Sequence, residues 1–297
     1  MLNSIGCRWV RVGCFATCLS VCASGAMRMI SFAEEGLTAV QSGKARRLDQ
    51  MRSRALRATI RIIPKTPNSP ESEAQTQTVE LHPQPLFRYD DQPRGFRDAT
   101  LWVWTHQGRP VAIEKVEDSM DVNRGPTWVT CLASVSPHLI RATWDGGYDW
   151  TSTKPGIQFK SIKDGPNPET TEAGRLRQFK ALSERFTAAI QVYSGDRQEL
   201  RLLPRRLHRY QIAAEQVTDA VMFGWTSNGT NPDAVLILEL HTSASGAAEW
   251  AYSLAPVTAD KLWLKLDDII VQTKAQTIYP SDETLIFFFE KNAEVIE

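Results

Sequence analysis

Acidic and aromatic side chains alternate around a Gly-Gly turn at residues 144–150, which read Trp-Asp-Gly-Gly-Tyr-Asp-Trp. In such a pattern the rings could stack on a sugar ring while the carboxylates accept hydrogen bonds from its hydroxyl groups. We therefore predict that this stretch forms a binding site from Trp144, Asp145, Tyr148, Asp149 and Trp150. The alternative is the end of a strand and a turn whose aromatic rings face the core.

A second polar stretch, Ser-Asn-Gly-Thr-Asn-Pro-Asp at 227–233, could form a binding loop with Asn231 and Asp233 as its candidate binding residues. Asn228 followed by Gly229 also favours the tight turn of a β-hairpin, because both residue types tolerate a positive φ angle. A hairpin alone would explain the stretch, so the two interpretations stay open at this point.

Catalysis would need a different arrangement, in which Glu117 and Glu239 face each other across a cleft. A carboxylate pair can act as acid and base when its surroundings separate the two pKa values. The chain has no Gly-x-Ser-x-Gly, no phosphate-binding loop and no His-Glu-x-x-His. Its five histidines stand singly, without a second His or Cys at metal-ligand spacing. We predict no catalytic residue, no metal site and no cofactor.

The charge balance argues against nucleic acid as a partner. The chain carries 34 basic and 34 acidic residues, so no net field attracts a polyanion. One segment, 44–61, carries seven basic residues against a single acid, Asp49. It could touch an acidic polymer or a membrane surface, but we favour a helix packed on a sheet with a solvated basic face.

The chain repeats itself. Tyr89 matches Tyr210 and Trp104 matches Trp225 at an offset of 121 residues, and Trp128 matches Trp250 at an offset of 122. A register held over such a length indicates an internal duplication. Residues shared by both copies are expected to be structural first, which leaves the copy-specific residues as the better binding candidates.

Each copy has the same predicted order of elements. Helices are expected over 44–57 and 170–187, each followed by six short strand-like runs with tight turns between them, in the first copy at 58–63, 78–89, 99–106, 110–117, 127–135 and 139–144. We predict an α+β fold of two tandem repeats, each one helix plus a five- or six-stranded, mostly antiparallel sheet. The boundaries are 34–159 for repeat 1, 160–172 for a linker and 173–297 for repeat 2. The repeats would form either two lobes or one pseudo-symmetric body.

The first 33 residues predict a secretory signal peptide, because two arginines precede an apolar run followed by small residues. Leu19 to Cys22 loosely matches a lipoprotein signal, so attachment of a lipid to Cys22 is the alternative. The apolar run is too short for a spanning helix, so no transmembrane segment is expected in the mature chain. Beyond this leader only Cys131 remains, and its apolar neighbours predict a small buried side chain.

Several segments, among them Arg-Leu-Arg-Gln-Phe-Lys at 175–180, Asp-Ala-Val-Met-Phe-Gly-Trp at 219–225 and Trp-Ala-Tyr-Ser-Leu-Ala-Pro at 250–256, resemble a large family of exported bacterial proteins with no assigned activity. That resemblance implies no catalytic or binding residue. We predict an exported, non-enzymatic binding or envelope-associated module. A polysaccharide or another envelope protein is the expected partner. The alternatives are a hydrolase of an extracellular or cell-envelope polymer, and a membrane-surface lipoprotein.

Overall fold

The computed structural model describes residues 42–63, 77–121, 125–145, 147, 149–193, 195–227, 229–242, 245–277 and 287–292. The chain divides into two compact units, 1–50 and 51–297. A helix runs over 42–55, close to the predicted 44–57. The predicted signal peptide and Cys22 lie outside the described residues. The description that follows concerns the second unit.

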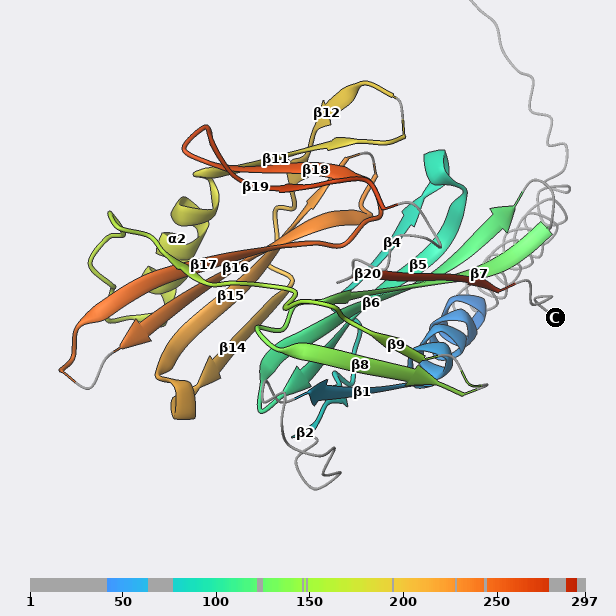
Figure 1. Ribbon diagram of the computed structural model, residues 1–297, viewed down its shortest axis with the longest axis horizontal. Helices are drawn as coiled ribbons and strands as arrows, with labels where there is room; N and C mark the ends of the chain where they lie inside the picture. The colour runs from blue at the N-terminus through green and yellow to red at the C-terminus, as the bar shows by residue number, and fades with distance from the viewer. Residues whose placement is uncertain are drawn as a thin grey trace, which may run out of the picture. The chain divides into compact units, whose positions relative to one another are not determined.

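Four antiparallel sheets are formed by the described residues of 51–297 (Figure 1). Sheet A has the order β2-β1-β8-β9, with β1 at Ala58–Ile63, β2 at Gln77–Thr78, β8 at Leu139–Trp144 and β9 at Asp149–Thr151. Sheet B has the order β20-β7-β6-β5-β3, with β4 also paired to β5; its strands are β3 at Glu80–Leu81, β4 at Phe87–Asp91, β5 at Phe96–His106, β6 at Arg109–Asp121, β7 at Gly125–Ser134 and β20 at Phe287–Asn292.

The later strands form two sheets with matching orders. Sheet C has the order β10-β17-β16-β15-β13, with β14 also paired to β15; its strands are β10 at Lys160–Ser161, β13 at Arg201–Leu202, β14 at His208–Ile212, β15 at Val217–Thr226, β16 at Pro232–Thr242 and β17 at Ala248–Pro256. Sheet D has the order β12-β11-β18-β19, with β11 at Phe186–Gln191, β12 at Arg197–Glu199, β18 at Lys261–Leu266 and β19 at Ile269–Lys274. Short 3-10 turns, η2 at Gln92–Arg94 and η3 at Ala213–Glu215, follow β4 and β14.

We call residues 58–151 the first half and 186–274 the second half. Each half forms a 4-stranded sheet and most of a 6-stranded one, whereas the sequence predicted a single sheet per copy. Hydrophobic periodicity identifies strands but not their partners, and β8 pairs with β1 rather than continuing the sheet of β7. The predicted strand 78–89 is divided among β2, β3 and β4. Pro83 and Pro85 separate β3 from β4, because proline cannot donate to a ladder.

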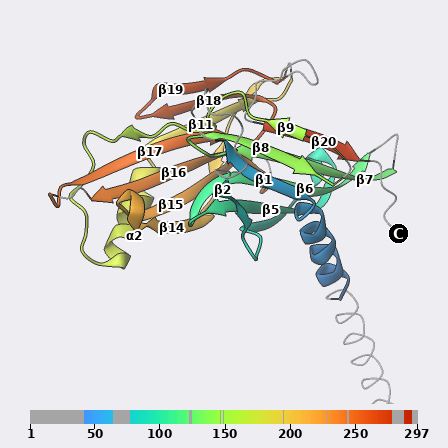
Figure 2. The same ribbon diagram turned by 60° about the horizontal axis from the view of Figure 1, so that its bottom comes forward.

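One strand of each 6-stranded sheet comes from outside its half. β10 follows the first half and pairs with β17 of the second half, within the segment predicted as a linker. β20 follows the second half and pairs with β7 of the first half, as both ribbon views show (Figures 1 and 2). The sheet of the second half is therefore bordered by β10, which follows the first half in sequence. The sheet of the first half is bordered by β20, which follows the second half in sequence.

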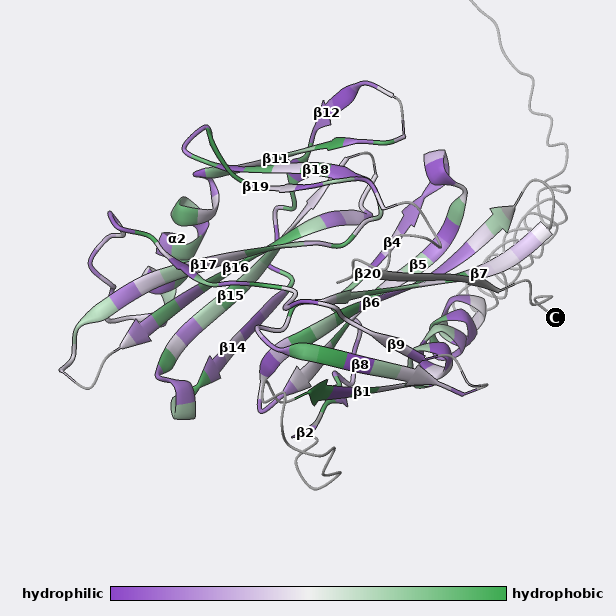
Figure 3. Ribbon diagram, viewed as in Figure 1, coloured by the Kyte–Doolittle hydropathy of each residue, from purple (hydrophilic) through white to green (hydrophobic). Residues whose placement is uncertain are grey.

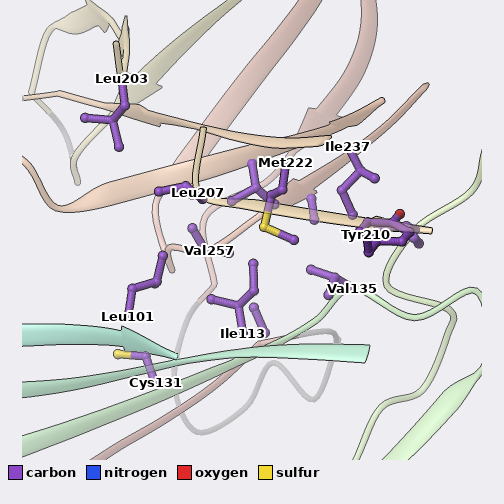
Figure 4. Packing of buried hydrophobic residues seen from close by; sticks show 14 of the residues in the cluster. Leu101, Ile113, Cys131, Val135, Leu203, Leu207, Tyr210, Met222, Ile237 and Val257 are labelled. Atoms are coloured by element: carbon purple, nitrogen blue, oxygen red, sulfur yellow. The ribbon is translucent and has the colours of Figure 1, made fainter. Parts of the chain in front are cut away.

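Three hydrophobic clusters fill the spaces between sheets. One lies between sheets A and B and includes Ile60, Ile140 and Leu132. A second joins sheets B and C and so combines both halves, with Leu101 and Ile113 facing Met222 and Ile237 (Figure 4). The third lies between sheets C and D. β16 is buried on both faces, since its residues alternate between the second and third clusters.

Helix α2 at Glu172–Ser183 closes the cluster between sheets C and D (Figure 2). Thr171 caps it by accepting a hydrogen bond from the Gly174 backbone N–H at 3.1 Å. Phe179 is buried against the edge of Trp250, with ring centroids 5.0 Å apart. The helix is shorter than the predicted 170–187, because β11 already begins at Phe186.

Some solvent-facing elements are hydrophilic by contrast. Edge strand β12 reads Arg-Gln-Glu and is exposed along its length (Figure 3). In the basic helix over 42–55, Arg52 is exposed, and Arg54 places its guanidinium carbon 4.5 Å from the centroid of the Trp128 ring. This packing agrees with the predicted helix on a sheet.

Candidate functional site

The tryptophans predicted to bind a sugar lie on the core side of sheet A. Trp144 is 7% exposed and belongs to the cluster between sheets A and B, against which Trp150 also packs. Trp150 pairs with the buried Ala142 across the strands, so both side chains share that inner face. Tyr148 lies outside the described residues. The two rings are thus used in packing, as the structural interpretation of this stretch expects.

The two acids of the same stretch are exposed. The Asp149 carboxylate accepts a hydrogen bond from Nε of Arg141 at 3.0 Å, and the Arg141 guanidinium lowers the pKa of Asp149. The backbone N–H of Asp145 donates to the carbonyl of Arg57 at 3.1 Å. These contacts are local to sheet A and do not bring the acids next to the predicted residues of the second stretch.

Asn231 lies at a buried junction between the two halves, in the turn that joins β15 to β16. It is 2% exposed. Its amide oxygen accepts a hydrogen bond from Nζ of Lys115 at 2.8 Å, and its amide nitrogen donates to Glu117 at 3.3 Å. The same Glu117 carboxylate accepts from the hydroxyl of Tyr89 at 2.7 Å. Burial raises the pKa of Glu117, and the nearby Lys115 ammonium opposes that rise.

Asp233 enters the same junction. It is fully buried and accepts hydrogen bonds from Nη1 of Arg94 and from the backbone N–H of Ser227, both at 2.9 Å. Asp91 is also fully buried, with its nearest cation, Nε of Arg94, at 3.5 Å. Burial raises the pKa of Asp91, and Arg94 opposes that rise. We call Tyr89, Asp91, Arg94, Lys115 and Glu117 the first dock, and residues 227–233 the second turn.

A corresponding junction is formed by residues at the matching positions. Tyr210 donates its hydroxyl hydrogen to Glu239 at 2.5 Å, as Tyr89 does to Glu117. Arg109, from the turn between β5 and β6, donates to Glu239 at 2.7 Å and to Glu215 at 2.8 Å. We call Tyr210, Glu215, Glu239 and His241 the second dock, and residues 106–111 the first turn.

Both turns approach the opposite half closely. Gly108 and Gly229 have φ angles of +87° and +62°, which a side chain rarely tolerates. A Cβ at Gly108 would lie 3.6 Å from the carbonyl oxygen of Gln211, and one at Gly229 would lie 3.4 Å from that of Asp90. The strong hairpin signal in the sequence therefore marks a turn that packs on protein.

The two carboxylates considered for catalysis, Glu117 and Glu239, are hydrogen-bonded within these docks. Glu117 is 2% exposed and Glu239 is fully buried, and each is bound by a tyrosine of its own half and a side chain of the other. A general acid or base must reach the proton it transfers, and these oxygens are occupied by protein donors. Burial also raises the pKa of both tyrosines. The geometry of the docks serves to hold the halves together.

A partly exposed site that the sequence prediction did not include lies on the outer face of sheet D. β18 reads Lys-Leu-Trp-Leu-Lys-Leu and alternates, with Leu262 and Leu264 in the core and Lys261, Trp263 and Lys265 on the opposite face. The ammonium nitrogen of Lys261 is 4.8 Å from the centroid of the Trp263 ring. The predicted sites rested on acids near glycine turns, so this alternation of lysine and tryptophan was missed.

Neighbouring strands complete this surface, which we call the sheet D face. The guanidinium carbon of Arg197, on β12, is 5.0 Å from the Trp263 centroid. On β19, Ile270 is 51% exposed and pairs with Lys265 across the strands. The sheet D face thus consists of Arg197, Lys261, Trp263, Lys265 and Ile270.

The part of the chain that the structure describes contains no group of three or more His, Cys, Asp or Glu side chains able to hold a metal ion. Nor does any helix among the described residues combine the length and apolar character needed to cross a membrane. No protein-family model, curated protein or solved structure matches this chain.

Proposed function

We propose that this protein is an exported, non-enzymatic binding module, built from two repeats of one unit, that binds an acidic polysaccharide through the sheet D face. Export is supported by the pattern of residues 1–33. Duplication is supported by the matching strand orders of the two halves and by a sequence offset of 121 residues that becomes 122 after the turn. The ligand assignment is supported by the chemistry of the sheet D face.

The observation that carries the proposal is Trp263, a half-buried residue with the cationic groups of Arg197 and Lys261 within 5.0 Å of its ring centroid. The fold does not require an aromatic residue there, because the matching position in sheet A is Arg141, which pairs with Asp149. Cations gathered at an indole ring can meet the acidic groups of a sugar polymer, while the exposed part of the ring contacts the sugar.

The charges select an anionic ligand. Among the described residues neither Lys261 nor Lys265 has a salt-bridge partner, and the only acid paired on this face is Glu199, which contacts Arg197 at 3.2 Å. Two unneutralised ammonium groups on the same face of one strand match the repeated carboxylates of an acidic polysaccharide. Such binding should weaken as salt rises, because screening acts strongly on exposed charges.

Isothermal titration calorimetry against polygalacturonate tests the proposal, with neutral dextran as the comparison polymer. We expect binding to polygalacturonate only, and at least a tenfold loss of affinity in Trp263→Ala and in the double variant Lys261→Glu, Lys265→Glu. The matched control is Arg61→Glu, a charge reversal on the exposed face of sheet A, which should bind as the parent protein does.

Equal binding by Trp263→Ala, or equal affinity for dextran, would show that the sheet D face is not the site. The non-enzymatic part is tested separately by following reducing ends in the same mixtures. Steady release of reducing ends that disappears in Glu117→Gln would favour the hydrolase alternative.

A further inference from the structure

The docks and turns of the two halves differ in charge at several matching positions, including the following four. The first half has Arg94, Arg109, Val111 and Lys115 where the second half has Glu215, Asn231, Asp233 and Ile237. The offsets are those of the duplication, 121 residues before the turn and 122 after it. Charge is thus reversed or replaced at the places where one half touches the other.

The present pairing matches these charges. The second turn brings Asp233 to Arg94 at 2.9 Å and Asn231 to Lys115 at 2.8 Å. The first turn brings Arg109 to Glu215 at 2.8 Å and to Glu239. The cations of the first dock, Arg94 and Lys115, therefore receive the acid and amide of the second turn, although Asp91 and Glu117 lie beside them. The acids of the second dock receive the cation of the first turn.

Pairing of like halves would mismatch them. If a first turn entered a first dock, Arg109 would take the place of Asn231 beside Glu117, but it would also face Arg94 and Lys115. Val111 would take the place of Asp233, so Arg94 would lose its acidic partner. If a second turn entered a second dock, Asp233 would face Glu215 and lose Arg94. Except for the exposed Glu215, these positions are buried or half-buried, and an unpaired or like charge at a buried junction is strongly disfavoured.

We propose that the charges of the two docks make each half accept only the other half, so that any association of two chains through this face joins the first half of one to the second half of its partner. This inference concerns recognition between the halves and is independent of the sheet D face. Because the two halves have matching strand orders, a half could in principle pair with a copy of itself or with the other half. The four charge differences disfavour the pairing of a half with a copy of itself.

Charge inversion in the full chain tests the matching. Arg94→Asp and Asp233→Arg should each lower the equilibrium constant for folding at least tenfold in urea denaturation, and the double variant should recover most of that loss. The control inversion, Arg141→Asp with Asp149→Arg, acts on an ion pair whose partners are 49% and 42% exposed. It should change the constant less than threefold.

Asp233 is fully buried, so Asp233→Arg alone could fail to fold. Glu215 is 53% exposed, and Glu215→Arg gives the second dock the charge of the first with little steric change. It should lower the unfolding midpoint clearly more than Glu215→Gln, because it repels Arg109. Equal effects of these two variants, or a double variant no better than the sum of its singles, would overturn the charge matching.

Mixing tests recognition between chains. The Arg94→Asp chain and the Asp233→Arg chain each lack a matched first junction, but together they complement each other. The carboxylate introduced at position 94 of one chain meets the guanidinium introduced at position 233 of the other. The second pair between the chains is the native one, Arg94 of the Asp233→Arg chain with Asp233 of the Arg94→Asp chain. Refolding them as an equimolar mixture should yield a species of twice the mass by light scattering, absent when either is refolded alone. A mixture that behaves as the sum of its components would overturn recognition between separate chains.

Discussion

Glu114 is a buried acid whose environment favours its neutral form. It is fully buried on β6, where the matching residue of the second half is Leu236. Nε1 of Trp104 donates to its Oε2 at 2.8 Å, and its Oε1 has no hydrogen-bond partner among the described residues. Burial raises the pKa of Glu114 to about 8, although the Trp104 hydrogen bond opposes the rise.

This environment predicts a loss of stability as pH rises. Below the unfolded pKa of 4.5 both states are protonated, and between 4.5 and about 8 only the unfolded state releases the proton. Glu114→Gln keeps an acceptor for Trp104 without the ionisation, so it should be more stable than the parent protein by on the order of 2–4 kcal/mol at pH 8. Urea denaturation at pH 4.5 and pH 8 checks this, and a parent curve that is flat over that range would contradict it.

His208 has the opposite dependence. Its ring stacks on Tyr210 at 5.9 Å between centroids, as Phe87 stacks on Tyr89 at 6.3 Å in the first half. It also meets His82, with ring centroids 5.7 Å apart. Burial, and to a lesser extent His82, lower the pKa of His208 to about 4.

The free energy of unfolding therefore falls as pH drops from 6.5 towards 4. In that range His208 binds a proton in the unfolded chain but not in the folded protein. His208→Phe, which copies the first half, should remove about 1–2 kcal/mol of this acid sensitivity. Thermal midpoints at pH 7 and pH 4.5 measure the effect. His138→Phe is the control, and an unchanged difference between the two midpoints in His208→Phe would count against this explanation.

At the scale of residues, the sequence prediction named two binding candidates without their surroundings. Asn231 and Asp233 were chosen because polar groups gather in one turn, and the structure places both in a buried junction. Their partners, Arg94 and Lys115, are more than a hundred residues away in the chain, so no local pattern connects them. The charge differences between matching positions of the two halves are visible in the sequence, but the structure is needed to show which of these residues meet.

At the scale of elements, the segment between the halves is attached to sheet C. Gly165 packs beneath Trp250, whose Nε1 donates to the carbonyl oxygen of Pro166 at 2.7 Å. A Cβ at Gly165 would lie 2.4 Å from Cδ1 of that ring, so any side chain must displace the tryptophan from the face of α2.

Gly165→Ala should therefore destabilise the protein by about 1–3 kcal/mol, the usual range for overpacking. It should also increase hydrogen exchange in α2. Hydrogen exchange followed by mass spectrometry distinguishes a general loss of stability from a local loosening of α2. Gly195→Ala, in a turn where the nearest atom is 3.1 Å away, serves as the comparison. Equal exchange in α2 for both variants would show that Gly165 does not hold the ring.

The sequence predicted these elements better than their pairing. Both helices and most strand runs were located from periodicity and turn residues, since those signals are local. The division into two sheets per half depends on the pairing of β1 with β8 in the first half. The edge strands of the two 6-stranded sheets, β10 and β20, come from outside the half to which they are paired. A strand of two residues such as β10 carries too little periodicity to be recognised, and it lies in a stretch whose composition indicated a linker.

At the scale of the whole second unit, the halves share one hydrophobic cluster. Leu101 and Ile113 pack with Met222 and Ile237 between sheets B and C. Together with the docks and with strands β10 and β20, this shared cluster favours one pseudo-symmetric body over two separate lobes. Neither half can lose its structure without exposing the apolar face of the other.

We therefore expect residues 51–297 to unfold in a single cooperative step. Differential scanning calorimetry of the full chain should give one transition whose calorimetric and van't Hoff enthalpies agree. Ile237→Ala, at the shared cluster, should lower the midpoint of the whole transition, since it costs about 2–5 kcal/mol. Two resolved transitions, with only one moved by Ile237→Ala, would indicate halves that unfold independently.

The pairing of β20 with β7 also has a consequence for synthesis. A ribosome that has completed β7 must add roughly 150 more residues before β20 exists, which takes on the order of ten seconds at ~5–20 residues per second. Throughout that interval the backbone of β7 offers an open edge to any other extended chain. The nascent first half is thus exposed to aggregation for longer than the second half, and a chaperone that shields strand edges would matter most before translation reaches the final strand.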